Sequence, residues 1–369
     1  MCKSTIRRRR SRKKLFRRIL LLIFILFLLG IGILFGTSYG HQLRVELAET
    51  ILITQHRDLA KYTFLSKEEL DDLLYKIEHP TTRNSDDSRD EKLSPKQIQQ
   101  RKNAPLNIKI ETIDSPETAR YHFVGKLITI SNPFNVKLVT QKGTQGKERG
   151  EKISVMAKRN HALAAVNASG FPDETGTGGG AVGTGVIIEN GKNINASVGE
   201  DSPMLVAGLT KYGKMITGNY SAQQLLNKKV VSAAGFLPQL IVDGEKLITS
   251  GDGGYGINPR TIMAQKRDGS IMFLIIDGRR PPHSIGASIK ECQDILYDKG
   301  AINAMAMDGG ASSVIYAMGE IINKPATVQK GARSLPNAWV VTANEGQHVK
   351  VTVDGKEETQ GNIKKIIGS

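Results

Sequence analysis

The stretch RTIMAQKRDGSIMFLIID, residues 260 to 277, decides the fold class. Two runs of mainly β-branched and other apolar residues flank Asp268-Gly269, a dipeptide that is typical of a two-residue hairpin turn. The pattern therefore predicts a pair of antiparallel strands. The second run ends at Asp277, so an acid is expected at the edge of the predicted sheet.

Similar short runs continue on both sides of this hairpin. Asn190-Gly191 and Asp243-Gly244 lie where further hairpin turns are expected. Helical spacing recurs in three places, at residues 154–159, 221–228 and 288–299. Together these signals predict an α+β domain over residues 106–345, built on a mixed, largely antiparallel sheet with a few helices. The tail, residues 346–369, predicts one more hairpin.

The N-terminus predicts a membrane anchor. Residues 1–18 carry ten Lys or Arg and no acid, and an uncharged apolar run follows from Ile19 to Gly36. Eighteen helical residues span about 27 Å, and residues 37–40 can add a turn, so we expect a transmembrane helix over 19–40. The positive-inside rule predicts a single-pass protein of the cell membrane, with a cytoplasmic N-terminus and the domain outside. A cleaved signal peptide is the competing interpretation, but its apolar core is usually shorter.

Residues 41–105 connect the anchor to the domain. Helical spacing continues to residue 78 and includes a capping box, Ser66-x-x-Glu69. The sequence then becomes polar and is interrupted by prolines, which is typical of a linker. We therefore expect a helical stalk followed by a flexible linker.

Charge and cysteine content exclude several classes of partner. The formal charge is +15, but the first 18 residues supply +10 of it, which leaves 41 basic against 36 acidic residues. Too small a basic excess remains to predict nucleic-acid binding. Cys2 and Cys292 fall on opposite sides of the predicted membrane, and no Cys/His spacing typical of a metal site occurs. A divalent cation such as Ca²⁺ stays open as a cofactor.

Two acids follow predicted strands at positions where a simple turn does not explain them. An acid at a strand end lies at the mouth of the core, where partial desolvation can change its pKa. Asp277 is followed by two arginines and two prolines, and Asp308 by Gly309-Gly310 and paired serines. The alternative is that each acid only begins a turn. His283 lies on the same loop as Asp277 and is a candidate acid or base, or an ordinary surface histidine.

Arginines are frequent on the same predicted loops. Arg260, Arg279, Arg280 and Arg333 each lie within two residues of a Gly or Pro. The planar guanidinium binds phosphate or carboxylate through two parallel hydrogen bonds, so these arginines favour an anionic substrate. Their alternative role is that of solvated surface charges. Glu291 is open in the same way, because Ser288-x-x-Glu291 is also a capping box.

Six motifs, in this order, resemble those of the phosphodiester glycosidase family. They are Ala165 to Phe171, Arg260-Thr261, Asp277-Gly278-Arg279, Gly286 to Glu291, Asp308 to Ser312, and Arg333 with Asn337. The resemblance covers roughly half of the chain and excludes the anchor and stalk. Two departures stand out: Ala168-Ser169-Gly170 replaces a glycine pair, and Ala311 stands where a third glycine is common.

The resemblance implies roles for individual residues. Asp308, Asp277 and Glu291 are expected to be catalytic, with Asp308 and Asp277 acting at the sugar as nucleophile, base or electrostatic partner. We expect Arg260 and Arg333 to hold the phosphate. The full set expected to bind substrate or phosphate is Asn167, Arg260, Arg279, Gly309, Gly310, Ser312, Arg333 and Asn337.

The expected function is hydrolysis of sugar-1-phosphodiester linkages. Departure from the anomeric carbon develops oxocarbenium-like charge that carboxylates stabilise, and a phosphate monoester is a good leaving group. The substrate is then a cell-surface glycan, an exopolysaccharide or another sugar phosphate outside the membrane. The alternatives are a non-catalytic binding protein for phosphate-bearing polysaccharide, and a metal phosphatase that a chelator would inactivate.

Overall fold

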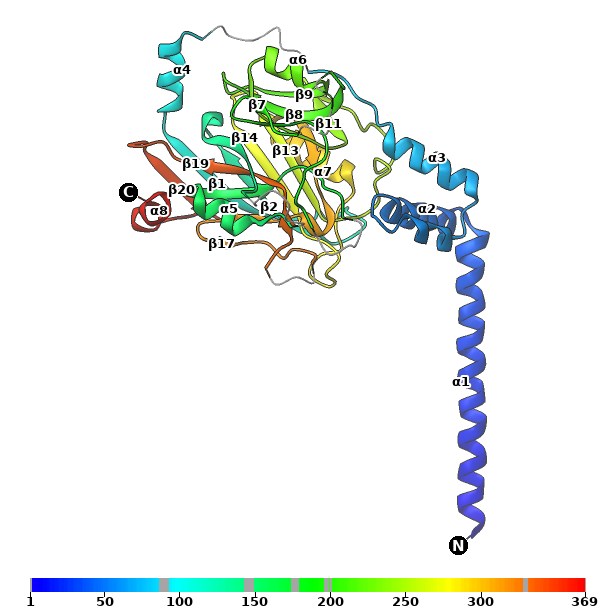
Figure 1. Cartoon of the computed structure of the whole chain (residues 1–369). Coiled ribbons are helices and arrows are strands. Elements are labelled where there is room, and N and C mark those ends of the chain that lie inside the picture. Colours follow the sequence, from blue (N-terminus) through cyan, green and yellow to red (C-terminus); the bar gives the residue numbers. More distant parts are fainter. Residues whose placement is uncertain are drawn as a thin grey trace. The chain divides into compact units, whose positions relative to one another are not determined.

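A computed structural model describes residues 2–85, 93–142, 149–173, 179–195, 199, 201–327 and 331–368, with side chains from residue 14 onward. The chain divides into two compact units, Met1–Leu74 and Tyr75–Ser369. The long apolar helix belongs to the first unit and the β-sheets to the second (Figure 1).

The first unit begins with α1 (Cys2–Gly36), whose segment Lys14–Gly36 is long and apolar enough to cross a membrane. At 1.5 Å per residue, these 23 residues extend over about 35 Å. The helix α2 (Ser38–Leu52) starts at the N-cap Thr37, whose side chain accepts a hydrogen bond from Gly40 N. The predicted extra turn over residues 37–40 is therefore wrong, because these residues begin a new helix.

The stalk contains two further helical segments, η1 (Arg57–Thr63) and α3 (Lys67–Glu78). The predicted capping box at the start of α3 is confirmed, since Glu69 N donates to Ser66 Oγ and Ser66 N donates to the Glu69 carboxylate. A short helix, α4 (Pro95–Lys102), precedes the sheets and has a capping box at Ser94.

The largest sheet contains nine strands within the described residues, and its neighbours are antiparallel except for one parallel pair, β1 with β20. In order across the sheet the strands are β12 (Glu245–Lys246), β11 (Gln239–Val242), β15 (Ala301–Met307), β13 (Arg260–Lys266), β14 (Ile271–Ile276), β2 (Val124–Ile130), β1 (Leu106–Asp114), β20 (Val349–Val353) and β21 (Lys356–Glu357). The opening hairpin of the sequence, β13 with β14, is confirmed. This sheet is called the large sheet below.

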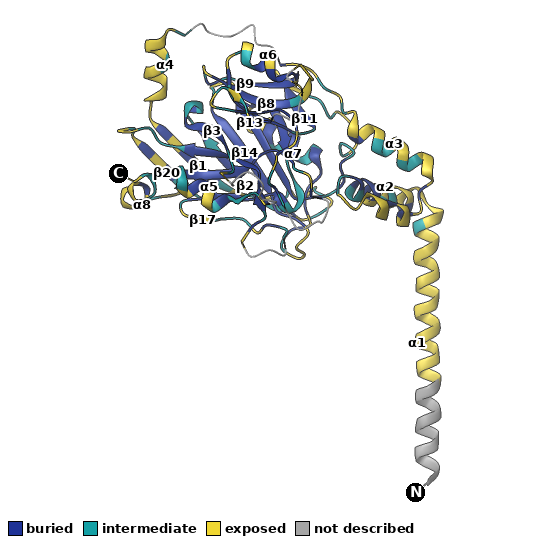
Figure 2. Ribbon diagram, in the orientation of Figure 1, coloured by how far each residue is buried: buried dark blue, intermediate teal, exposed yellow. Residues whose placement is uncertain are grey.

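A second sheet packs against the large sheet. Its strands, in order, are β17 (Glu320–Ile321), β16 (Ile315–Ala317), β5 (Ala162–Asn167), β19 (Asn337–Thr342) and β3 (Val136–Thr140). The core between the two sheets includes Phe273 from β14 and Trp339 from β19, whose ring centroids lie 6.5 Å apart. Figure 2 shows these strands as the buried interior, and α3, α4 and the described part of α1 as largely exposed.

A third sheet and four helices complete the second unit. The strands of this sheet, in order, are β7 (Lys192–Asn193), β6 (Ile187–Glu189), β10 (Val230–Gly235), β8 (Met204–Thr210) and β9 (Met215–Tyr220), and β4 (Glu151–Lys152) pairs separately with β18 (Ser334–Leu335). The helices are α5 (Ile153–Arg159), α6 (Ala222–Asn227), α7 (Ile289–Asp298) and α8 (Gln360–Ile367), with short turns η2 (Pro133–Asn135) and η3 (Gly310–Ser312). The predicted α+β class with largely antiparallel sheets is confirmed.

The C-terminal tail is part of the domain. The strand β20 pairs with β1 in the large sheet, and Ile363 of α8 joins the core between the sheets. The predicted hairpin is confirmed as β20 with β21. The compact unit therefore continues past residue 345, because the edge of the large sheet depends on a strand beyond it, and the boundary of the predicted glycosidase domain at residue 345 stays a prediction.

Part of the predicted flexible linker is bound to the domain. Arg83 exchanges hydrogen bonds with the side chain of Gln239, through its N–H at 2.9 Å and its carbonyl at 2.9 Å. Ser85 N donates to Thr217 O at 2.8 Å. The expected flexibility is therefore corrected for residues 82–85, and residues 86–92 lie outside the described residues.

Candidate active site

Asp277 and Asp308, the two acids at strand ends, lie at the same end of the strands of the large sheet. This end of the sheet is called the edge below. Thr261 of β13 pairs with Met307 of β15, and Arg260 pairs with Ile276 of β14. Because β13 runs antiparallel to both neighbours, its first residues lie beside the last residues of β14 and β15. Asp277 and Asp308, one position beyond those strands, therefore emerge on either side of the start of β13.

The second sheet contributes Asn167 to this edge. Asn167 is fully buried, and its Nδ2 donates to the Asp308 carbonyl at 2.6 Å. Its Oδ1 accepts from Thr261 Oγ1 at 2.9 Å and from Val314 N at 3.1 Å. Asn167 therefore uses its side chain to position the Asp308 backbone between the sheets, and it has a structural role at the predicted site.

Asp308 is the most strongly perturbed carboxylate at this edge. Burial raises the pKa of its carboxyl to about 7, and the nearby Ser312 hydroxyl and Gly309 N–H lower that pKa only in part. The residue keeps some solvent exposure. Among the described residues, Ser312 Oγ has no partner at strict hydrogen-bonding geometry. A carboxyl with such a pKa exchanges protons near neutral pH.

The Gly309-Gly310 turn brings the backbone close to its neighbours. Gly310 N donates to Pro259 O at 2.9 Å, and Gly310 has φ of +60°, which disfavours a side chain. A Cβ on Gly309 would lie 2.9 Å from the same carbonyl oxygen. The two glycines therefore let the Asp308 turn pack directly against the loop before β13.

Arg279 is the predicted arginine that lies at this turn. Its Nη2 donates to Asn258 Oδ1 at 2.5 Å, and its guanidinium lies 3.6 to 3.8 Å from where a Cβ on Gly310 would be. Arg279 is exposed as a residue, whereas Asn258, which accepts this hydrogen bond, is fully buried. The structure thus places a cation beside the Asp308 turn.

The geometry of Arg260 differs from the one we expected. The side chain is buried, and its Nε and Nη2 donate to the carbonyls of Ala287, Tyr255 and Gly256 at 3.0, 2.8 and 2.5 Å. Burial lowers the pKa of the guanidinium to about 10. These nitrogens hold the loop before β13 against residue 287, which gives Arg260 a structural role, and its expected phosphate contact stays a prediction.

Arg333 is also engaged within the protein. It forms an ion pair with the buried carboxylate of Asp173, and its guanidinium lies 5.2 Å from the ring centroid of Phe171. A paired and largely buried guanidinium has less capacity to bind a phosphate than an exposed one. Both arginines are thus engaged within the protein, and the phosphate contacts expected of Arg260, Arg333 and Arg279 stay predictions.

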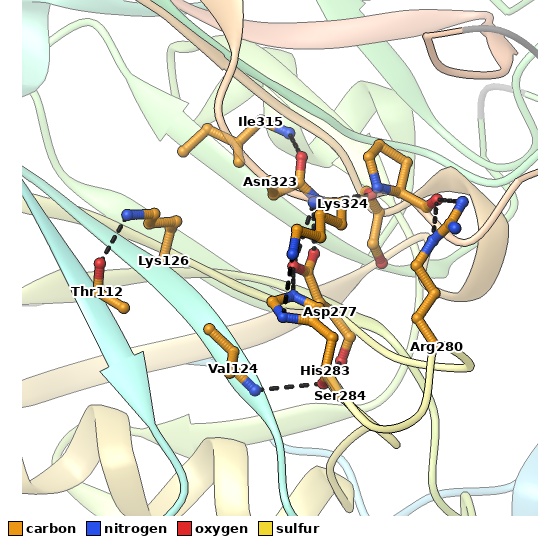
Figure 3. Close-up of polar contacts among 12 residues, drawn as sticks. Thr112, Val124, Lys126, Asp277, Arg280, His283, Ser284, Ile315, Asn323 and Lys324 are labelled. Carbon is orange, nitrogen blue, oxygen red and sulfur yellow. Dashed lines mark hydrogen bonds and ion pairs between the residues drawn. The ribbon is translucent and has the colours of Figure 1, made fainter.

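Asp277 is bound from several sides (Figure 3). Its carboxylate accepts hydrogen bonds from Asn323 Nδ2 at 2.9 Å and from Lys324 N at 3.1 Å, and it lies 2.9 Å from His283 Nε2. Asn323 also donates to Ser313 O at 3.2 Å. These bonds join the loop after β14 to the segment that follows the Asp308 turn. These contacts position Asp277 between the two segments, and its expected catalytic role stays a prediction.

Arg280 also binds the loop after β14 to the segment that follows the Asp308 turn. Its Nε and Nη2 donate to Pro325 O at 2.9 and 2.6 Å, and Nη2 also donates to Thr327 O. His283, weighed from the sequence as an acid or base, turns Nε2 to Asp277 and Nδ1 to Lys324 Nζ, 3.4 Å away. Asp277, Arg280 and His283 together are called the loop latch below, because they bind residues 323–327 to the loop that carries Arg279.

Two further predicted residues support the fold of the site. Glu291 accepts from Ser288 N at 2.7 Å and Ser288 Oγ at 2.8 Å, so the capping-box interpretation is confirmed. Asn337 Oδ1 accepts from Ser169 N at 2.9 Å, and both residues are buried. Asn337 therefore fixes the Ala168-Ser169-Gly170 stretch in which this chain departs from the family pattern.

Sequence reasoning missed Asn258 and Asn323, which bind Arg279 and Asp277. The sequence gives only a weak signal for Asn258, its position before the Pro259-Arg260 step. Within the described ranges no group of three or more His, Cys, Asp or Glu could hold a metal ion, so the possible Ca²⁺ stays an untested prediction.

The fold and the Asp308 site together define a class of protein. Residues 160–342 match the family model described as phosphodiester glycosidase, and they include Asn167, Arg279, Asp308 and Asn337. This domain of the chain belongs to the phosphodiester glycosidase family.

Among particular relatives, the chain is 26% identical over 182 residues to the SPbeta prophage-derived protein YomE of Bacillus subtilis. It is 23% identical over 221 residues to the N-acetylglucosamine-1-phosphodiester α-N-acetylglucosaminidase of Bos taurus. These matches cover 48% and 54% of this chain but only 28% and 40% of the relatives. The catalytic domain of the zebrafish enzyme of the same name superposes with a TM-score of 0.54 at 20% identity, over 71% of this chain and 87% of that one, and shows the same fold.

Proposed function

We propose that this protein is an enzyme that hydrolyses sugar-1-phosphodiesters. One observation carries the proposal: the half-buried Asp308, with a pKa of about 7, lies on a Gly-Gly turn beside the Arg279 guanidinium. An acid that exchanges protons near neutral pH and a cation for an anionic leaving group are the two parts that this reaction needs.

In the proposed reaction, a water molecule attacks the anomeric carbon. The Asp308 carboxylate takes the proton of this water while the bond between the anomeric carbon and the phosphate oxygen breaks. The bonding electron pair leaves with that oxygen, which gives a free sugar and a phosphate monoester. The negative charge of the Asp308 carboxylate stabilises the oxocarbenium-like transition state, and Arg279 binds the departing phosphate.

Two buried hydroxyls in the segment after Asp308 support substrate binding at this turn. In the described part of the chain, Ser312 Oγ and Ser313 Oγ have no hydrogen-bond partner, although both residues are almost fully buried. A buried hydroxyl without a partner is unfavourable by about 1–3 kcal/mol. We propose that sugar hydroxyls or phosphate oxygens of the substrate supply the missing partners.

The names of the relatives guide the choice of substrate. The bovine enzyme is named for N-acetylglucosamine-1-phosphodiesters, and this chain covers 40% of its length. We propose the same class of linkage for this chain, carried by a cell-surface glycan or an exopolysaccharide. The apolar run Ile19–Gly36 lies within the helix segment Lys14–Gly36 and follows ten basic residues, and it supports a membrane anchor with the domain outside the cell membrane.

A binding protein for phosphate-bearing polysaccharide is the alternative, and product analysis separates the two. The full chain in detergent is incubated with a GlcNAc-1-phosphodiester, and released GlcNAc and new phosphate monoester are measured. We expect both products from the wild type, and binding without either product would overturn the proposal.

Arg279→Ala tests the phosphate contact. We expect this variant to raise KM for the phosphodiester about tenfold or more, because a charge-assisted hydrogen bond contributes about 1.5–3 kcal/mol. Arg267→Ala, which removes an exposed arginine from the β13–β14 hairpin, is the matched control and should leave KM unchanged. Equal effects of the two substitutions would contradict a specific role of Arg279.

A further inference from the structure

The turn after the apolar helix holds α2 in a fixed direction. Thr37 Oγ1 donates to Ile33 O at 2.6 Å, and a Cβ on Gly40 would lie 2.2 Å from the same oxygen. Only glycine at position 40 lets the start of α2 pack so closely on the last turn of α1. Figure 1 shows α2 lying crosswise to α1. If α1 spans a bilayer, α2 therefore runs along its surface.

Phe64 returns to the end of α1. Its ring packs edge-to-face on Phe35, with centroids 5.5 Å apart and an interplanar angle of 74°. Arg44 lies 5.2 Å above the Phe35 ring, and its Nη1 donates to Phe64 O at 2.8 Å. These contacts fix Phe64 at the level where the apolar helix ends. Aromatic side chains with one apolar and one polar end, Tyr and Trp, concentrate at this level of membrane proteins, and Tyr39 and Tyr62 lie in the same region.

This region exposes apolar side chains and buries acidic ones, which is the reverse of a protein surface in water. Phe64 is 68% exposed and Tyr39 57% exposed, and Leu47, Leu59 and Tyr62 are also exposed. The same helical layer buries two acids, Glu46 and Glu49. Acidic residues are among the least often buried, and clustered exposed apolar side chains mark an interaction surface.

We propose that α2, η1 and Phe64, together called the interfacial foot, lie in the outer headgroup region of the bilayer that α1 spans. The occupant of the exposed apolar surface is the boundary between lipid headgroups and acyl chains. The contact of Phe64 with Phe35 at the end of α1 supports this placement, which depends on the proposed membrane anchor. The strength with which such a helical layer binds a membrane increases with the apolar area that enters the lipid.

Spin-label depth measurements on the full chain in phospholipid nanodiscs test the proposal. Cys2→Ser removes the N-terminal thiol, and Cys292 is fully buried, so a label attaches at the chosen site. Single cysteines are placed at Phe27 within α1, at Phe64 and Tyr39 in the foot, and at Val155 and Tyr297 as exposed references in the domain. Relative collision rates with oxygen and a water-soluble nickel complex report the depth of each label.

We expect the label at position 27 to be deepest, and those at 64 and 39 to lie between it and the references. Labels at 64 and 39 that match the references, while position 27 reads as buried in lipid, would overturn the foot and leave the anchor intact. If position 27 also reads as aqueous, the anchor and the foot both fail. Unmodified Cys2→Ser protein should take up no label, which checks the burial of Cys292.

Discussion

Asp308→Asn should stabilise the folded domain at alkaline pH while it abolishes activity. Burial raises the pKa of the Asp308 carboxyl from 3.8 to about 7. The carboxyl therefore ionises more readily in the unfolded chain than in the folded one. Between these two pKa values folding takes up a proton, so the free energy of unfolding falls as the pH rises through this window.

The magnitude follows from the size of the shift. Each pH unit corresponds to about 1.4 kcal/mol, so the full shift corresponds to about 4 kcal/mol. Asp308 keeps some solvent exposure, and screening by water reduces this value to about 2 kcal/mol. The asparagine variant cannot ionise, so we expect it to gain about 2 kcal/mol at about pH 8 and little at about pH 4.

Urea unfolding followed by tryptophan fluorescence measures this difference. The chain has a single tryptophan, Trp339, which is buried between the two main sheets, so its emission reports this domain alone. Asp268→Asn is the control, because Asp268 is partly desolvated but Ser270 hydrogen bonds lower its pKa overall. The control should lose stability at about pH 8. An Asp308→Asn variant that is no more stable than wild type at about pH 8, or equally affected at both pH values, would refute the reasoning.

Two further substitutions test the supports of the site. Asp277→Asn should lower the free energy of unfolding by about 2–3 kcal/mol and speed limited proteolysis within residues 323–327, because the loop latch loses its charged acceptor. An inactive variant of unchanged stability and protease resistance would instead make Asp277 a reacting group. Gly218→Ala places a Cβ 2.2 Å from Asn84 Oδ1 and should release residues 82–85 to protease. Gly319→Ala has a similar positive φ but no neighbour within 4 Å, and equal proteolysis of the two variants would show that docking of Asn84 plays no part.

Local signals in the sequence predicted the secondary structure of the site well. The turn dipeptide at Asp268-Gly269 and the alternation around it are properties of neighbouring residues, and the hairpin formed as expected. The acids at positions 277 and 308 were placed correctly at strand ends, because a strand end is also a local feature. The capping role of Glu291 follows from a four-residue pattern.

The roles that depend on distant partners could not be read from the sequence. The Asp277 carboxylate accepts hydrogen bonds from Asn323 and Lys324, which lie 46 and 47 positions away in the sequence. No local pattern marks either of these residues. Arg83 binds Gln239 across 156 positions, so its polar surroundings in the sequence predicted a linker. An arginine within two residues of a Gly or Pro can bind phosphate or protein oxygens, and only the fold shows that Arg260 binds backbone carbonyls and Arg279 binds the Asn258 side chain.

The central claim is that the Asp308 site cleaves the bond between the anomeric carbon and the phosphate oxygen. Hydrolysis of a GlcNAc-1-phosphodiester in ¹⁸O-labelled water tests it, with both products analysed by mass spectrometry. We expect wild-type protein to place the label in the sugar and none in the phosphate monoester, and Asp308→Asn to form no product. Label in the phosphate, or turnover by Asp308→Asn at the wild-type rate, would contradict it.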